Sequence, residues 1–346
     1  MRCDGGPTTG VGHVIRSIAL AEEFAARGAT VTFLSNLGDV PWVRRQLTDR
    51  GFPVVPGPAT AGDMLAAVEA YDLDLVVIDS YVLDPACGAA LREAGVPVVS
   101  IVDGDTRGQI ADLYVDQNLD AELIPVSLPP GAGRLAGLRY ALLRDSVRAQ
   151  RPAAPRNAAG TGVPQVLCFF GGTDAYGAAP ILVRLLAETR RPFAATVVAG
   201  RPDLAAVLAG IETGAGQSVA VIEPTDRLPA LIATADLVVS ASGTSTWELL
   251  CLGAPAAMVW VVDNQRLGFD RVVARGLAVG LGRLEELAAS GTAAEVAVRA
   301  LRELLARPDL RASLSVRAWS AVDGRGRVRV TDAALGLIQD KNPIQL

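Results

Sequence analysis

The chain has 346 residues, half of them apolar, which is enough for two domains with buried cores. Its formal net charge of −5 excludes the basic surface that attracts nucleic acid, and its apolar runs fall short of the roughly 20 residues that span a membrane. The chain has one histidine and four scattered cysteines, none in a CxxC pair. We therefore expect no metal site, no cofactor, and reduced thiols in a cytoplasmic protein.

Segments typical of strands and of helices alternate through the first part of the chain. Apolar runs predict strands at 30–34, 54–55, 75–79 and 97–102, and helical spacing predicts helices at 14–26, 40–49, 64–71 and 85–94. Strands that are apolar throughout are typical of parallel sheets covered by helices on both faces. Only three residues precede Asp4 and the first glycine-rich loop, so the first strand is expected to be very short or truncated.

A stretch rich in proline and alanine at 151–164 is typical of a linker between domains. After it the alternation resumes, with strands predicted at 166–170, 195–199, 219–222, 237–240 and 256–262, helices at 180–188, 228–235, 246–252 and 265–275, and a mostly helical tail from 285. The sequence therefore predicts an α/β protein with two Rossmann-like, doubly wound parallel-sheet domains, 1–150 and 165–340. We expect the two domains to face each other across a cleft that binds the ligand.

His13, the single histidine, lies in the run Gly10-Val11-Gly12-His13, which opens a predicted helix. Histidine has the side chain whose ordinary pKa is closest to neutral pH. A helix N-terminus disfavours the imidazolium, so a ring at this position can accept a proton. The alternative is a glycine-rich turn that carries a histidine without a chemical role.

Two glycine-containing turns follow predicted strands in the second half, Gly171-Gly172-Thr173-Asp174 and Ser242-Gly243-Thr244-Ser245, and both precede helices. Backbone N–H groups at a helix N-terminus can bind phosphate without lysine. The GxxxxGK[ST] pattern is absent, which excludes a Walker-type nucleotidase, and a clean GxGxxG for NAD is also lacking. The two turns together favour a nucleotide diphosphate, although each alone is equally consistent with an ordinary strand–helix turn.

Three further polar side chains are candidates for binding the rest of a nucleotide sugar. Glu248 lies one turn into the helix after the second glycine turn, where a carboxylate can accept both ribose hydroxyls; the alternative is a surface glutamate. Asn264 and Gln265 follow a strong strand, so their amides can bind sugar hydroxyl or acetamido groups. Tyr81 follows the strand at 75–79, at the strand end where α/β ligand sites lie.

In this order along the chain, these motifs resemble the PseG/SpsG family, which comprises the UDP-sugar hydrolase of pseudaminic acid biosynthesis and related spore-coat polysaccharide proteins. The resemblance covers almost the whole chain. The residues that carry it are 10–16, 78–81, 114–118, 140–144, 170–174, 235–236, 242–248 and 263–265.

The resemblance implies the GT-B architecture, similar to that of MurG-type glycosyltransferases. It places His13, Tyr81 and Asn264 around the anomeric carbon of the sugar. It also implies that Glu248 holds the ribose and that the turn at 244–246 holds the diphosphate. The full set of residues expected to bind the nucleotide sugar is Gly12, Gly171, Gly172, Thr173, Gly243, Thr244, Ser245, Thr246, Glu248 and Gln265.

The chain departs from the family pattern after its fifth strand, where many relatives carry two adjacent acids and this chain has Val102-Asp103-Gly104-Asp105. The departure leaves the acceptor more open than the donor. With water as nucleophile the chain is a UDP-sugar hydrolase, which is the leading hypothesis. With an alcohol of a small molecule or polysaccharide it is a UDP- or dTDP-sugar glycosyltransferase. A non-catalytic nucleotide-sugar-binding protein is a third hypothesis, against which His13 argues.

Overall fold

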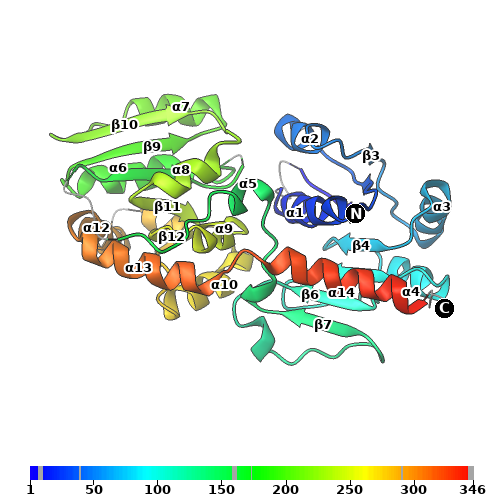
Figure 1. Ribbon diagram of the computed structural model, residues 1–346. Helices are drawn as coiled ribbons and strands as arrows, with labels where there is room; N and C mark the ends of the chain where they lie inside the picture. Colours follow the sequence, from blue (N-terminus) through cyan, green and yellow to red (C-terminus); the bar gives the residue numbers. More distant parts are fainter. Residues whose placement is uncertain (7–10, 39, 158–161, 173, 290, 342–346) are drawn as a thin grey trace. The chain divides into compact units, whose positions relative to one another are not determined.

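The structure is a computed structural model that describes residues 1–6, 11–38, 40–157, 162–172, 174–289 and 291–341 (Figure 1). The chain forms two compact units. The first contains Met1–Asp145 and Gly324–Leu346, and the second contains Ser146–Asp323. Each unit has its own parallel sheet, so the prediction of two Rossmann-like α/β domains is confirmed.

The described residues of the first unit form a seven-stranded, all-parallel sheet in the order β3-β2-β1-β4-β5-β6-β7. The strands are β1 (Arg2–Cys3), β2 (Phe33–Leu34), β3 (Val54–Val55), β4 (Val76–Asp79), β5 (Val98–Ile101), β6 (Leu113–Asp116) and β7 (Gly133–Ala136). The first strand is as short as expected, yet it lies in the middle of the sheet, where Cys3 is in register with Asp79.

Helices connect these strands as the apolar spacing predicts. They are α1 (Gly12–Ala26), α2 (Pro41–Thr48), α3 (Ala61–Tyr71) and α4 (Ala86–Glu93), with short 3₁₀ turns at Ala121–Leu123 and Leu138–Tyr140. The apolar face of α1 contributes to two core clusters, because Ile18 packs in a cluster with Phe33 while Leu20 packs in another with Val77. This burial on both flanks fixes the start of α1 against the central strands.

The described part of the second unit has a six-stranded, all-parallel sheet in the order β10-β9-β8-β11-β12-β13. Its strands are β8 (Gln165–Phe169), β9 (Phe193–Val198), β10 (Gln217–Ile222), β11 (Leu237–Ala241), β12 (Ala256–Trp260) and β13 (Val279–Arg283). Its helices are α6 (Ala178–Glu188), α7 (Pro202–Ala209), α8 (Leu228–Thr234), α9 (Ser245–Cys251), α10 (Asp263–Ala274), α11 (Leu284–Ala288), α12 (Thr292–Ala306) and α13 (Pro308–Ala321), and α5 (Asp145–Arg148) lies at the junction with the first unit. Within the described residues, no helix combines the length and the apolar composition that crossing a membrane requires.

Both sheets reverse their strand order at one point, between β1 and β4 in the first unit and between β8 and β11 in the second. In open α/β sheets, ligands bind beyond the carboxyl ends of the strands at this topological switch point. The His13 loop follows β1, and both predicted phosphate turns follow strands of the second switch point, β8 and β11. The topology therefore brings His13 and the two predicted phosphate turns to the strand ends where such folds bind ligands.

The last helix departs from the predicted domain boundary, which assigned residues up to 340 to the second domain. Helix α14 (Gly326–Lys341) instead packs against α1 of the first unit, where it buries Val330 and Ala334 in the core (Figure 1). The Arg327 guanidinium, almost fully buried, forms an ion pair of 2.8 Å with Glu22 of α1. A helical pattern does not show which sheet the helix covers, so the sequence could not place α14.

The start of α14 is packed so tightly that only glycine fits there. A Cβ on Gly326 would lie 2.3 Å from the carbonyl oxygen of Ala141, which is backbone and cannot move aside. We expect Gly326→Ala to destabilise the protein by about 1–3 kcal/mol, as overpacking does, measured by urea unfolding followed by circular dichroism. Gly336→Ala on the same helix is the control, because no atom of the described residues lies within 4 Å of its Cβ position. That control should be neutral or stabilising, by about 0.5–1 kcal/mol; equal losses in both variants would contradict this packing.

Candidate active site

A histidine–aspartate pair occupies the switch point of the first unit. His13 is the second residue of α1, and Asp79 is the last residue of β4. The Nδ1 of His13 lies 2.5 Å from Oδ1 of Asp79, whose side chain is 1% exposed. The carboxylate can only accept at this contact, so Nδ1 carries the proton and donates it. In the neutral ring the other nitrogen, Nε2, is then the acceptor, and no hydrogen bond joins it to another of the described residues.

Arg16 binds both oxygens of Asp79, and its Nη2 also lies 3.3 Å from Nδ1 of His13. It lies one turn beyond His13 on α1, and its Nε and Nη2 donate to the two Asp79 oxygens over 2.6 and 2.7 Å. Its Nη1 and Nη2 also donate to the oxygens of Asp103, over 2.9 and 3.0 Å. The buried guanidinium therefore binds two carboxylates, each in a two-point contact. Such paired, charge-assisted hydrogen bonds fix both position and orientation.

Asp103 joins the loops that follow β4, β5 and β6. The Tyr81 hydroxyl donates to Oδ2 of Asp103 over 2.5 Å, and the Asn118 amide donates to Oδ1 over 2.8 Å. The rings of Tyr81 and His13 are 4.4 Å apart and cross at 87°, an edge-to-face contact. The Arg107 guanidinium lies over the Tyr81 ring at 4.2 Å. His13 and Tyr81, both predicted as site residues, are thus brought into contact.

The electrostatics of this cluster keep its acids charged and its phenol neutral. Burial alone would raise the pKa values of Asp79 and Asp103, but the Arg16 charge and the hydrogen bonds to these acids hold both below their usual range. Burial, followed by the Asp103 charge, raises the pKa of the Tyr81 hydroxyl. Tyr81 is therefore a hydrogen-bond donor to a permanent carboxylate at neutral pH.

Sequence reasoning missed the support of this site. Asp79, Arg16, Asp103 and Asn118 were part of quoted motifs but had no predicted role. A partial signal exists for Arg16, since a residue three after His13 lies on the same helix face. Nothing in the spacing could show that Asp103, 24 positions after Asp79, would share its arginine.

In the second unit, the turn after β11 and the helix α9 carry the predicted nucleotide residues. Gly243 and Thr244 form the turn, and Ser245 is the first residue of α9. The Thr246 hydroxyl is buried and has no hydrogen-bond partner within the described residues. Glu248, one turn into α9, is also largely buried, at 7% exposure. A buried hydroxyl without a partner is a costly arrangement that a bound polar ligand would relieve.

The β12–α10 junction places two further predicted residues on this unit. Gln265 accepts a hydrogen bond from the Val261 N–H over 3.0 Å, and its amide nitrogen lies 3.8 Å from the Cβ position of Gly243. Its amide nitrogen therefore lies beside the turn after β11. Asn264 is exposed on the first turn of α10. It belongs to the second unit, whereas His13 and Tyr81 belong to the first.

The other predicted phosphate turn follows β8 and differs from the expectation. Gly171 and Gly172 are exposed, and Thr173 lies outside the described residues. The first N–H groups of α6, at Ala178 and Ala179, are taken by the Asp174 carboxylate over 2.8 Å each. The helix end that motivated this prediction is thus occupied by a negative charge of the chain itself, which disfavours phosphate there.

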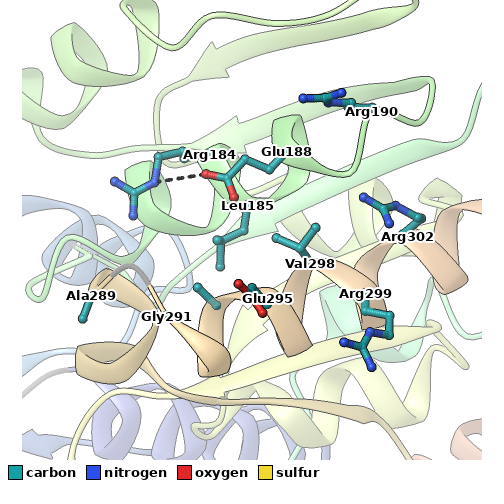
Figure 2. Close-up of a pocket in the computed structure, with 11 residues that line it drawn as sticks. Arg184, Leu185, Glu188, Arg190, Ala289, Gly291, Glu295, Val298, Arg299 and Arg302 are labelled. Atoms are coloured by element: carbon teal, nitrogen blue, oxygen red, sulfur yellow. Dashed lines mark ion pairs between the residues drawn. The ribbon is translucent and has the colours of Figure 1, made fainter.

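The second unit also has an open groove of about 580 Å³ between α6 and α12 (Figure 2). Its charged lining residues come from both helices and from the segment after α6, and they are Arg184, Glu188, Arg190, Glu295, Arg299 and Arg302. Arg184 and Glu188 form an ion pair of 3.8 Å. None of the predicted site residues lines the groove, so it is separate from the candidate site.

No family model matches the chain. An uncharacterized protein of Methanocaldococcus jannaschii is 21% identical over 276 residues, which cover 77% of this chain and 56% of that protein. The spore coat polysaccharide biosynthesis protein SpsG of Bacillus subtilis is 31% identical over 110 residues, which cover 32% of this chain and 31% of SpsG. The chain thus spans about half or less of these two relatives.

A third relative is matched over most of its length. The UDP-N-acetylglucosamine–N-acetylmuramyl-(pentapeptide) pyrophosphoryl-undecaprenol N-acetylglucosamine transferase of Sorangium cellulosum is 28% identical over 354 residues. The match covers 93% of this chain and 83% of that enzyme.

Two solved structures share the fold over nearly the whole chain. The MurG of Acinetobacter baumannii has a TM-score of 0.71 at 17% identity, with 96% of this chain and 98% of that one covered. The UDP-GlcNAc 2-epimerase of Neisseria meningitidis bound to UDP-GlcNAc has a TM-score of 0.64 at 14% identity. The match covers 96% of this chain and 98% of the epimerase chain. The expected GT-B fold is therefore confirmed, and the chain is a distant relative of SpsG and of MurG-like glycosyltransferases.

Proposed function

We propose that this protein is a nucleotide-sugar-dependent enzyme that transfers the sugar of a UDP-sugar to an alcohol acceptor and releases UDP. The observation that carries the proposal is the His13–Asp79 pair at the switch point of the first unit, with Nε2 of His13 left as an acceptor. A histidine oriented by a buried carboxylate is the arrangement that general-base catalysis uses. A pure binding protein has no need of it.

In the proposed reaction, Nε2 of His13 removes the proton of the attacking hydroxyl as its oxygen bonds to the anomeric carbon. The bond between that carbon and the diphosphate oxygen breaks, and its electron pair leaves with UDP. Asp79 holds the ring that becomes positively charged, and Arg16 keeps Asp79 in place. A positioned base of this kind contributes about 10²–10⁴-fold to the rate.

The second unit supplies the nucleotide site in this proposal. Backbone and hydroxyl groups of Gly243, Thr244, Ser245 and Thr246 bind the diphosphate, and Glu248 accepts the ribose hydroxyls. The unpaired Thr246 hydroxyl and the burial of Glu248 support this assignment. Asn264 and Gln265 bind the sugar. The capped end of α6 makes the Gly171–Gly172 turn the weaker of the two candidates.

Transfer to an alcohol ranks above hydrolysis because the relative matched over most of its length is a glycosyltransferase, as is the structural neighbour MurG. A PseG/SpsG-like hydrolase is the second candidate. It is favoured by the presence of His13, Tyr81 and Asn264 at the positions that the hydrolase pattern uses. The nucleobase of the sugar-nucleotide donor, uracil or thymine, is determined by the same experiment.

One experiment separates these candidates. A panel of UDP- and dTDP-sugars is incubated with the protein, and nucleotide release is followed with and without added alcohol and glycan acceptors. Release that requires an acceptor supports the transferase, and release into water alone supports the hydrolase. No release from any donor under either condition would contradict the proposed function.

Glu248→Ala is expected to weaken UDP binding measured by calorimetry. A hydrogen bond to a charged group contributes about 1.5–3 kcal/mol, so the affinity should fall by roughly tenfold or more. Glu212→Ala, an exposed glutamate of the same unit, is the matched control and should bind normally. Unchanged affinity in Glu248→Ala would rule out the ribose role.

A further inference from the structure

We infer that Tyr81 is a positioning residue for His13 and that the Tyr81 ring, in contact with the imidazole, does the positioning. The Tyr81 hydroxyl is held by Asp103 and takes no part in proton transfer. The inference deepens the proposed function, which it needs for its kinetic test. The family resemblance places Tyr81 around the anomeric carbon; the geometry of the first unit gives it a different task.

The first step of the argument is that the Tyr81 hydroxyl is already committed. It donates to Oδ2 of Asp103 over 2.5 Å. Asp103 is itself held by the Arg16 guanidinium and the Asn118 amide, over 2.8–3.0 Å. A carboxylate held by several donors is a rigid acceptor, so the hydroxyl has a fixed direction.

The second step is that giving up this proton is unfavourable. The resulting phenolate would face the negative charge of Asp103 at hydrogen-bond distance. Burial and that charge already raise the pKa of Tyr81. If Tyr81 donated this proton to help UDP leave, two anions would lie next to each other. Arg16 already pairs with two carboxylates and could not balance a third negative charge.

The third step is that the Tyr81 ring is the group that confines His13. The two rings meet edge to face at 4.4 Å, and the Arg107 guanidinium lies over the tyrosine at 4.2 Å. Asp79 and the Nη2 of Arg16 both contact Nδ1 of His13, and contacts at one ring atom leave the imidazole free to turn about that atom. Contact with the Tyr81 ring removes that freedom and fixes the direction of Nε2. A base displaced by about 1 Å can lose about 10²-fold in rate.

The kinetic test compares Tyr81→Phe, which keeps the ring, with Tyr81→Ala, which removes it. We expect Tyr81→Phe to lose less than about tenfold in kcat and Tyr81→Ala to lose about 10²-fold. Asp74→Asn, an exposed acid just before β4, is the control and should be unchanged. A Tyr81→Phe variant as slow as Tyr81→Ala would overturn the inference, because the hydroxyl would then be the active group.

A second readout does not depend on turnover. Because His13 is the only histidine, an imidazole ¹⁵N NMR spectrum of the full chain reports this one ring. We expect wild type, Tyr81→Phe and Tyr81→Ala all to keep the proton on Nδ1, which Asp79 fixes, and only Tyr81→Ala to show ring signals that are shifted and broadened by motion of the imidazole. A ring unaffected in Tyr81→Ala would overturn the inference even if the enzyme is active.

The two readouts also separate the inference from the proposed function. If no donor gives turnover in wild type, the proposed function fails and the NMR comparison still decides whether Tyr81 positions His13. Tyr81 is 41% exposed and lies outside the buried ion pairs of Arg16, so both substitutions should fold. The circular dichroism spectra and urea midpoints of the two variants check this.

Discussion

Replacing His13 with alanine should reduce the turnover of a UDP-sugar by about 10²-fold or more and leave UDP affinity unchanged. The loss is expected because Nε2 of His13 is the proposed base, in a ring that Asp79 orients. The affinity is expected to hold because the proposed nucleotide residues belong to the second unit. Steady-state release of UDP gives the first quantity, and calorimetry gives the second.

The Asp74→Asn variant serves as a control for the purification and the assay. Turnover close to wild type in His13→Ala would reduce His13 to a turn residue and would contradict the mechanism. A parallel loss of UDP affinity would instead show that His13 takes part in binding the nucleotide.

Asp79→Asn is expected to be nearly as damaging as loss of the base, although only one oxygen is replaced by nitrogen. Both Asp79 oxygens accept from Arg16, and one also accepts from His13. If the amide nitrogen faces His13, the ring must move its proton to Nε2, and the base is lost. In either orientation the amide nitrogen also meets an N–H of Arg16, because both Asp79 oxygens accept from Arg16, and two facing donors cost stability. We expect kcat to fall by about 10²-fold or more.

The Asp79→Asn prediction is checked by kcat and by the double variant with His13→Ala. Because the two residues act as a unit, the double variant should be no slower than His13→Ala alone. Additive losses would show that Asp79 acts independently of His13. A normal kcat in Asp79→Asn would contradict the proposed orientation of the ring.

Much of the fold could be predicted because local signals are strong in long, apolar elements. The helix at 14–26 and the strand at 75–79 have clear periodicity, and both are found in the structure. β7, with the sequence Gly-Arg-Leu-Ala, has no run of β-branched or aromatic residues, and the apolar run of β6 is a short Leu-Tyr-Val between Asp112 and Asp116. Both were missed because pairing with neighbouring strands, which the sequence does not display, creates them.

The candidate site likewise contains residues that the sequence could single out and residues whose role only the tertiary contacts show. His13 and Glu248 could be singled out because a residue type and its place at a helix start carry a chemical meaning by themselves. The roles of Arg16 and Asp103 could not, because they arise only when loops far apart in the chain meet at one sheet edge. Asp174 illustrates the reverse case. A glycine turn before a helix suggests an anion site, but the carboxylate next to it fills that site.

The placement of α14 has a consequence for how the protein is made. Synthesis runs from the N-terminus, and domains generally fold as their residues leave the ribosome. The first unit, which carries the His13 site, cannot cover Leu20 and Phe24 until α14, which follows the whole second unit along the chain, has been synthesised. The intervening second unit can fold earlier, so the unit that begins first is completed last. For this whole period its core is open to chaperones, and a nascent chain that stops before Gly326 cannot close it.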